Sequence, residues 1–560
     1  MNKSSLFSTK YTRRDLLILF VLVLLVRGLA ALPQQQPSYF DAAYYYVDGV
    51  NLAEGRGFEE DFVWNYLNQP GPPPQPSHLY WMPLTSMLAA LGMLIGGVSY
   101  RAAQMPFVVL SALLAPITYV IAYVLSGQRW SSWLAGLFAL FSGFYLPYWP
   151  AIDNFTPFAV FGSMALLLAG MENEAWRMKN KEWRPETGDK EASGSGLRLL
   201  CLMGAGVCIG LAHLSRADGS LLLIAIILLF VLRITHYTFI RPIPHISHSI
   251  FHDLRALILI SLAYFLTMLP WFLRTLDVTG SFLSTAGAKT VWLTSYDDLF
   301  SYGRELSLQT FLAQGVGPIL QGRWWALVNN FQTVLAVWGM IFLGPLALIG
   351  AWYLRRHILV QLAAMYALLL LIAMTVIFAF PGARGGLFHS GAALLPFIYA
   401  TAVIGLDRSV EWVADRRPRW RPKAAKRVFG IGLVVMAAAL SGFIYYQRVL
   451  KDNAWNSADS VYPAIVAWVA EQNPAAIVMI GNPPAYRYHG GGLSVVVPNN
   501  DLETVLQVMT KYGVDYLILD KNHPLPLDEI YNNPASQAEL PLLQTFKPGT
   551  GQEIYVFGEQ

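Results

Sequence analysis

The residues best suited to chemistry near the N-terminus are an aspartate and the tyrosines beside it. Asp41 stands in the segment SYFDAAYYY, a few residues after the first apolar run. A carboxylate can act as a general base, and the rings of Tyr44 and Tyr45 offer stacking surface for a sugar. Tyrosines also anchor proteins at membrane interfaces, which explains the rings equally well. Anchoring does not explain Asp41, which we take as a candidate base.

A second aspartate, Asp153, stands in the segment WPAIDNF between two apolar runs. Asp is a preferred N-cap residue, so capping of the following helix would explain Asp153. If the topology brings Asp153 to the membrane face of Asp41, the two carboxylates could bind a divalent cation. Alternatively, one could act as base while the other positions an acceptor. The cap and the functional role are compatible.

The composition shows which elements must position these acids. Hydrophobic residues make up 55% of the 560 residues and charged residues 13%, against about 25% charged residues in a typical soluble chain. Repeated apolar runs are long enough to cross about 30 Å of hydrocarbon as helices. We therefore predict a polytopic α-helical membrane protein and exclude disordered, fibrous and cytosolic classes. The net charge of +4 is modest, so nucleic acid is not an expected partner.

The placement of Lys and Arg predicts the orientation in the plasma (inner) membrane. Arg13 and Arg14 precede the first apolar run, and residues 407–427 carry eight bases against three acids. Cytoplasmic loops carry an excess of Lys and Arg, so the N-terminus and this loop are predicted to be cytoplasmic. Eleven crossings satisfy the rule: 15–32, 106–125, 130–149, 155–170, 199–214, 220–234, 256–273, 331–354, 360–380, 392–406 and 428–446.

Two long connections are predicted to lie outside. Residues 34–104 carry six acids against two bases, and their apolar stretch 83–98 is predicted to lie along the interface instead of crossing. Residues 275–328 form the second external loop. With this topology Asp41 and Asp153 share the outer face.

The C-terminal part of the chain has a different character. Residues 1–449 form the predicted transmembrane domain, and residues 450–560 a small extracytoplasmic domain with returning Pro, Asn and charged residues. Helices are predicted at 464–469 and 502–511, and strands at 476–480, 515–519 and 553–557. Helices alternate with strands, so this domain is predicted to be α/β.

Four motifs resemble the GT-C superfamily of integral membrane glycosyltransferases, especially protein O-mannosyltransferases and lipid A aminoarabinose transferases, and the resemblance covers about residues 11–400. They are Asp41 with its tyrosines and NLAEGRGF (51–58), YWMPL (80–84), Asp153 in the second external turn, and LSRADG (214–219). The resemblance is an ordered set of motifs and not a continuous match. It supports an interfacial position for residues 83–98.

The resemblance implies inverting transfer of a sugar from a polyprenyl-phosphate donor to a lipid, glycan or protein acceptor at the outer face. Asp41 matches the first-loop acid that deprotonates or orients the acceptor hydroxyl in the family. Asp153 matches the second-loop acid that supports the site or a metal. A divalent cation at Asp41 and Asp153 is therefore a candidate cofactor.

A leaving polyprenyl phosphate is anionic, so this chemistry needs cations where the charge develops. Arg384 and His389 stand in the glycine-rich turn 381–390. Glycines let a backbone approach a phosphate, and Arg offers a bidentate fork. The alternative for Arg384 is snorkelling at the interface. Arg216 is a further candidate at a helix end, and Arg27 ranks lower because an Arg near the interface is tolerated without a ligand.

The chain departs from the family pattern at two places. Ala42 follows Asp41 where many relatives carry a second acid, and Trp81-Met82 precede the proline where the lipid A enzymes have Glu-Lys. His78, just upstream, is a candidate to replace the lost polar contact, with a purely structural role as the alternative.

Two other classes of function compete with the enzyme. A lipid or saccharide transporter or flippase would have ionisable residues at the midplane, where this chain has few, and often an inverted repeat, which is not visible here. A non-catalytic envelope scaffold is opposed only by the paired acids.

Overall fold

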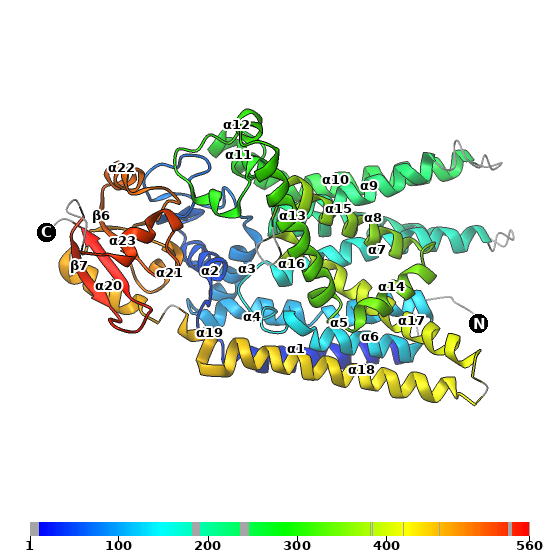
Figure 1. Cartoon of the computed structure of the whole chain (residues 1–560). Helices are drawn as coiled ribbons and strands as arrows, with labels where there is room; N and C mark the ends of the chain where they lie inside the picture. The colour runs from blue at the N-terminus through cyan, green and yellow to red at the C-terminus, as the bar shows by residue number, and fades with distance from the viewer. Residues whose placement is uncertain are drawn as a thin grey trace.

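The computed structural model describes residues 10–181, 191–235, 246–380, 382, 385–417, 419–458, 460–535 and 540–558. Long helices form a bundle, and a smaller domain with a β-sheet lies at one end of it (Figure 1). The bundle helices are α1 (Lys10–Ala31), α4 (Tyr100–Ser111), α5 (Leu114–Ser126), α6 (Arg129–Phe141), α7 (Phe155–Lys181), α8 (Glu191–Ser215), α9 (Ser220–Thr235), α10 (Ile246–Thr279), α13 (Val316–Gln332), α14 (Leu343–Tyr353), α15 (Ile358–Ile372), α17 (Leu395–Ala414) and α18 (Pro422–Tyr445).

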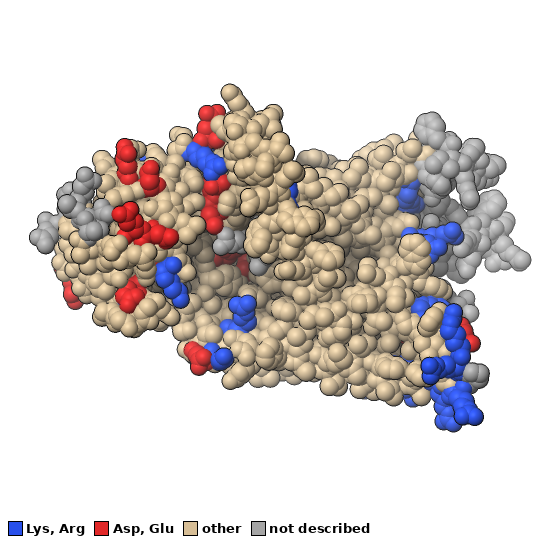
Figure 2. Space-filling model, in the orientation of Figure 1, with Lys and Arg blue, Asp and Glu red and all other residues tan. Residues whose placement is uncertain are grey.

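The surface of the bundle is that of a membrane protein. Many large apolar side chains on its helices are exposed, for example Leu262 and Phe265 on α10. On the face in view, Figure 2 shows a broad band of the bundle nearly without charge, with Lys and Arg gathered at the end remote from the sheet. Within the described residues, seven helical stretches are long and apolar enough to cross a bilayer. The predicted class, a multi-pass α-helical membrane protein, is confirmed.

The number of crossings stays a prediction, because several predicted spans are short or interrupted helices. α6 has 13 residues and α14 has 11. The predicted span 331–354 is broken: a π-helical turn at Thr333–Trp338 is followed by Met340 and Ile341 with positive φ before α14 begins. The break lets Trp338 leave the helix path and donate its Nε1–H to the Leu387 carbonyl at 2.9 Å.

Shorter elements fill the end of the bundle that faces the sheet. They are α2 (Phe40–Ala53), α3 (Leu84–Gly96), α11 (Thr285–Lys289), α12 (Leu308–Ala313), α16 (Gly386–His389) and α19 (Ala454–Ser457), with the strands β1 (Glu59–Glu60), β2 (Phe62–Val63) and β3 (Gln75–Pro76). The stretch predicted to be interfacial, 83–98, contains α3, which has only 13 residues.

The C-terminal domain contains the predicted alternation of helices and strands. Its elements are α20 (Tyr462–Gln472), β4 (Ile477–Ile480), α21 (Pro483–Tyr488), β5 (Ser494–Val496), α22 (Leu502–Tyr512), β6 (Val514–Leu519), α23 (Asp528–Asn532), β7 (Leu542–Phe546) and β8 (Ile554–Gly558). The sheet order is β2-β5-β4-β6-β8-β7, parallel from β2 to β6 and antiparallel for β7 and β8.

One edge strand of this sheet, β2, comes from the first long connection, Phe62 pairing with Ser494 and Val63 with Val495. The sheet therefore ties residues 62–63 to the C-terminal domain. This connection also carries Asp41 on α2, and Tyr46 on α2 packs edge-on against Tyr488 on α21 with ring centroids 5.2 Å apart. The C-terminal domain thus supports the helix that carries the candidate base.

Candidate active site

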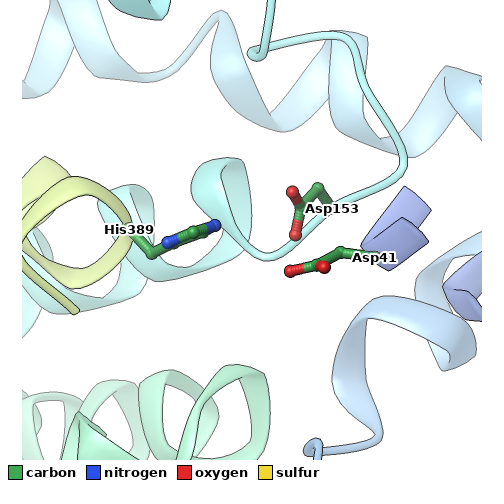
Figure 3. A group of neighbouring side chains, drawn as sticks. All are labelled: Asp41, Asp153 and His389. Carbon is green, nitrogen blue, oxygen red and sulfur yellow. The ribbon is translucent and has the colours of Figure 1, made fainter. Parts of the chain in front are cut away.

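The structure brings together three side chains that lie far apart in the sequence. Asp41 is in the first turn of α2, Asp153 in the turn before α7, and His389 at the end of α16. One carboxylate oxygen of each Asp and one ring nitrogen of His389 all lie within 4.8 Å of one another. Figure 3 shows the three side chains pointing toward a common centre.

Asp153 is completely buried and held by hydroxyl and backbone donors. Tyr39 donates its O–H to Oδ2 at 2.8 Å, and the N–H of Asn154 donates to Oδ1 at 2.6 Å. Asn154 in turn donates its Nδ2–H to the Tyr45 hydroxyl at 3.3 Å. The residue directly before α7 is Asn154, and no hydrogen bond from the first turn of α7 to the Asp153 side chain is present among the described residues. Capping therefore does not account for Asp153.

The pKa values of both acids are shifted upward. Burial raises the pKa of Asp41, an effect that the positive charge of Arg216 opposes. Burial, and then the charge of Asp41, raise the pKa of Asp153. Two close carboxylates in a dry site resist being ionised together. The pair therefore holds a proton more firmly than isolated aspartates do, and a bound cation would compete with that proton.

His389 completes a ligand set that fits a transition-metal cation. Its Nδ1 lies 3.2 Å from the carbonyl oxygen of Gly385. Nδ1–H can donate to this carbonyl, and Nε2 then remains free to accept or to ligate, an arrangement common for metal-binding histidines. Phe155 stacks on the imidazole with ring centroids 4.2 Å apart. Two carboxylates and one imidazole suit Zn²⁺ or Mn²⁺ and leave open positions for substrate.

Arg216, between α8 and α9, carries a positive charge that lowers the pKa of both Asp41 and Asp153 and so opposes part of the effect of burial. Its Nε donates to Asp218 Oδ1 at 3.2 Å. Asp218 also accepts the Ser390 hydroxyl, at 2.7 and 2.8 Å from its two oxygens. Among the described residues, the two Nη groups of Arg216 have no acceptor, which leaves them for a ligand in the cavity.

Glycines and a tryptophan explain why α16 can lie so close to Asp218. A Cβ on Gly386 would stand 2.1 Å from Asp218 Oδ2, and a Cβ on Gly391 would stand 2.5 Å from the Trp338 ring. The glycine-rich turn was predicted to let the backbone approach a phosphate. In the structure Gly386, which belongs to that turn, allows α16 to pack against Asp218, and Gly391, just after the turn, allows the close approach of Trp338.

Asp41 and His389 line a cavity of about 1450 Å³, whereas Asp153 is fully buried and is not among the lining residues. Toward α9 and α10 its wall is apolar, with Ile224, Phe265 and Phe272. Toward the first long connection its wall is aromatic, and there Trp64 and Trp81 stack with ring centroids 4.2 Å apart. A cavity with an apolar arm, aromatic rings and the Asp41 carboxylate can accommodate an amphiphilic substrate that carries a sugar.

Of the remaining predicted site residues, some line the cavity and others do not. Tyr45 lines the cavity. Tyr44 is not among the cavity-lining residues, and its hydroxyl accepts the backbone N–H of His78 at 2.9 Å. His78 lines the cavity, but its ring nitrogens lie 2.8 Å from the Ser77 hydroxyl and 3.0 Å from the Ser86 hydroxyl. Arg384 lies outside the described residues.

Burial, and then the charge of Arg274, lower the pKa of His78 to about 3. The imidazole is therefore neutral at physiological pH and cannot hold a phosphate by charge. Arg27, in contrast to His78, is not a cavity-lining residue: it is fully buried in the bundle and donates to the Ala139 carbonyl at 3.0 Å. Its contacts are those of a structural residue.

Sequence reasoning missed Tyr39 and Ser390 as supporting residues. Tyr39 stands two residues before Asp41, so the aromatic block could have marked Tyr39 as a candidate site residue. The sequence could not show that Tyr39 donates a hydrogen bond to Asp153, which lies 114 positions away. Ser390 directly follows His389 in the turn that was singled out, and its partner Asp218 stands in the LSRADG motif. Neither pairing leaves a signal in a single sequence.

No protein-family model matches the chain, and no curated protein matches it by sequence. Solved structures do match. The Archaeoglobus fulgidus oligosaccharyltransferase in its apo form has a TM-score of 0.55 at 13% identity, over 92% of this chain and 70% of its own. ArnT from Cupriavidus metallidurans, bound to undecaprenyl phosphate, has a TM-score of 0.53 at 13% identity, over 97% of this chain and 99% of its own. The chain therefore has the GT-C fold, as predicted.

Proposed function

We propose that this protein transfers a sugar from a polyprenyl-phosphate donor to an acceptor at the outer face of the membrane. The observation that carries the proposal is the close pair Asp41 and Asp153, of which Asp41 lines a cavity that also has an arginine and an apolar arm. Polyprenyl phosphates are found with two proteins of this fold: dolichol phosphate with the archaeal oligosaccharyltransferase AglB, and undecaprenyl phosphate with ArnT.

The chain's own residues suggest how the transfer proceeds. The polyprenyl chain lies in the apolar arm beside α9 and α10, and Arg216 binds the phosphate. The acceptor oxygen forms a bond to the anomeric carbon while the bond from that carbon to the phosphate oxygen breaks, with inversion. Asp41 takes the proton of the acceptor hydroxyl, and the polyprenyl phosphate leaves with the bonding electron pair as an anion stabilised by Arg216.

The orientation follows from the charged residues. Lys and Arg gather at the end of the bundle remote from the sheet (Figure 2), which by the positive-inside rule faces the cytoplasm. The acids, the cavity and the C-terminal domain then lie on the extracytoplasmic side, where lipid-linked sugars would be used. A transporter would need ionisable residues along the bundle, whereas the acids and Arg216 lie near one end.

The proposal is tested with the purified full-length protein in nanodiscs. Radiolabelled polyprenyl-phosphate sugars are supplied one by one, with and without an extract of membrane acceptors, and the label remaining on the lipid is measured. We expect at least one donor to lose its label in an acceptor-dependent reaction. If no donor in the panel is consumed above the level in protein-free nanodiscs, the protein is not this kind of transferase.

Asp41, Asp153 and His389 are also proposed to hold a divalent cation, which would stabilise negative charge developing at the reacting oxygens. Because the pKa values of both acids are raised, protons compete with the cation. Affinity for Zn²⁺ or Mn²⁺ is therefore expected to rise with pH until both acids are ionised, with protons released on binding.

Calorimetric titration in buffers of different ionisation enthalpy measures both the affinity and the number of protons released. Asp153→Asn should weaken binding by at least about tenfold, since even supporting residues of metal sites typically contribute about 10- to 100-fold. Glu59→Gln, at an exposed acid of the first long connection, is the matched control. Binding that does not depend on pH or on Asp153 would rule out this site.

A further inference from the structure

A second arginine lines the cavity on the side away from α9 and α10. Arg448 lies in the π-helical segment Tyr446–Leu450 that follows α18, and it lines the cavity together with Gln447, Tyr148 and Trp455. In Figure 1, α9 and α10 run along one side of the bundle, and α18 and α19 along the other. The cavity wall therefore reaches both sides of the molecule. Among the described lining residues, Arg216 and Arg448 are the only Lys or Arg.

Arg448 differs from the other arginines at this end of the molecule. Arg216 donates to the Asp218 carboxylate, and the others that the structure describes there donate to carboxylates or backbone carbonyls; they are Arg56, Arg101, Arg274, Arg304, Arg323 and Arg487. Arg448 is exposed and, within the described part of the chain, makes no hydrogen bond or ion pair. Its guanidinium is thus available to a ligand at the rim of the cavity.

A row of aromatic side chains connects Arg448 with the acids. Trp455 and Tyr148 each lie beside Tyr39, with ring centroids 6.0 Å apart in both pairs. Tyr39 donates its O–H to Asp153. Arg448, Tyr148, Tyr39 and Trp455 line the same cavity. A ligand bound at Arg448 could therefore extend along Tyr148 and Tyr39 to the carboxylates.

The part of the cavity between Arg448 and Asp41, lined by Tyr148 and Tyr39, forms a second arm. The geometry of inverting transfer assigns this second arm to one of the two substrates, an argument that rests on the proposed function. The incoming oxygen and the leaving oxygen stand on opposite sides of the anomeric carbon. If the leaving phosphate is bound at Arg216, between α8 and α9, the acceptor must approach from the side of Tyr39 and Tyr148. That is the arm at whose rim Arg448 stands.

We infer that the acceptor carries an oxyanion such as a phosphate, which Arg448 binds at the rim while the acceptor hydroxyl reaches Asp41. A guanidinium binds phosphate through two parallel hydrogen bonds, which fixes orientation as well as position. Arg448 is then a specificity-determining residue that selects anionic acceptors. The phosphate belongs either to a lipid headgroup, since Arg448 follows the membrane helix α18, or to a water-soluble phosphate ester.

Binding experiments with defined probes test the inference without requiring turnover. The full-length protein is placed in phosphatidylcholine nanodiscs, and excess undecaprenyl phosphate is added to fill the donor arm. Dioctanoyl phosphatidate, glycerol 3-phosphate and uncharged dioctanoylglycerol are then titrated against wild type, Arg448→Gln and Arg448→Lys. Lys451→Gln removes an exposed cation three residues further on that does not line the cavity, and is the matched control.

We expect Arg448→Gln to weaken binding of a phosphate-bearing probe by about tenfold or more, because hydrogen bonds to charged groups are worth about 1.5–3 kcal/mol. Arg448→Lys should restore part of this loss, and Lys451→Gln should bind like wild type. Dependence on Arg448 for phosphatidate alone supports a lipid acceptor, and dependence for glycerol 3-phosphate as well supports a soluble one. Binding of both phosphates independently of Arg448, or equal binding of dioctanoylglycerol, would overturn the inference.

The transfer assay separates this inference from the proposed function. Once a donor that is consumed and its acceptor have been identified, Arg448→Gln should raise KM for the acceptor and leave kcat and KM for the donor unchanged. A rise in KM for the donor instead would overturn the assignment to the acceptor. If phosphate probes bind in an Arg448-dependent way but no donor is consumed by wild type, the anion site stands and the transferase proposal fails.

Discussion

Asp41→Asn is expected to lower kcat for sugar transfer by about 10²- to 10⁴-fold, the usual contribution of a positioned general base. The amide has nearly the same shape as the carboxylate but cannot take the acceptor proton. Asp41 stands in the first turn of α2, where its side chain is half-buried at the cavity wall. The substitution should therefore disturb the chemistry and leave the fold intact.

The measurement is single-turnover transfer with a saturating donor, so that binding and chemistry are separated. Membrane expression, thermal stability and undecaprenyl phosphate binding should equal those of wild type, because the amide has the shape of the carboxylate and the raised pKa of Asp41 shows that its negative charge does not stabilise the fold. Glu59→Gln, at an exposed acid of the same connection, should transfer at the wild-type rate. Full activity of Asp41→Asn would remove Asp41 from the mechanism.

The meeting of Asp41 and Asp153 could be predicted because it follows from the counting of helices. Each apolar run reverses the side of the membrane, so the charge of the loops decides which face a turn occupies. This argument gives the face but not the distance. The structure adds that both acids lie within 4.8 Å of His389, and His389 had been selected only as a candidate for binding phosphate.

The position of His389 could not be predicted because it depends on tertiary contacts of a four-residue helix. Two hydrogen bonds hold α16 in place. Trp338, at the break in the preceding helix, donates to the Leu387 carbonyl, and Ser390 donates to Asp218. Hydropathy shows residues 331–354 only as a continuous apolar run. The break appears where packing around Trp338 outweighs the preference for a regular helix.

The edge strand β2 escaped prediction for a similar reason. It has two residues, Phe62 and Val63, too few to show an alternating pattern. Its place in the sheet is decided by its partner β5, more than 400 residues later in the chain. In contrast, the strands of the C-terminal domain are apolar runs bounded by turn residues, which a single sequence does reveal.

Arg216→Gln is expected to lower kcat by about 10²- to 10³-fold, the range seen when one donor to a developing oxyanion is removed. Negative charge grows on the phosphate as the sugar leaves, so the guanidinium contributes more in the transition state than in the bound donor. The loss should therefore appear mainly in kcat. The geometry supports this role, because Arg216 lines the cavity and its Nε donates to Asp218, which Ser390 holds, while both Nη groups have no acceptor among the described residues.

Single-turnover transfer and undecaprenyl phosphate binding are measured for Arg216→Gln, Arg216→Lys and Ser390→Ala. Arg216→Lys keeps the charge but loses the fork, so it should recover only part of the rate. Ser390→Ala frees Asp218, which then orients Arg216 less well, and should cost less than Arg216→Gln. Lys451→Gln should transfer like wild type. If Arg216→Gln keeps both its rate and its affinity for undecaprenyl phosphate, the leaving phosphate does not bind at Arg216, and the assignment of the two arms of the cavity would have to be reversed.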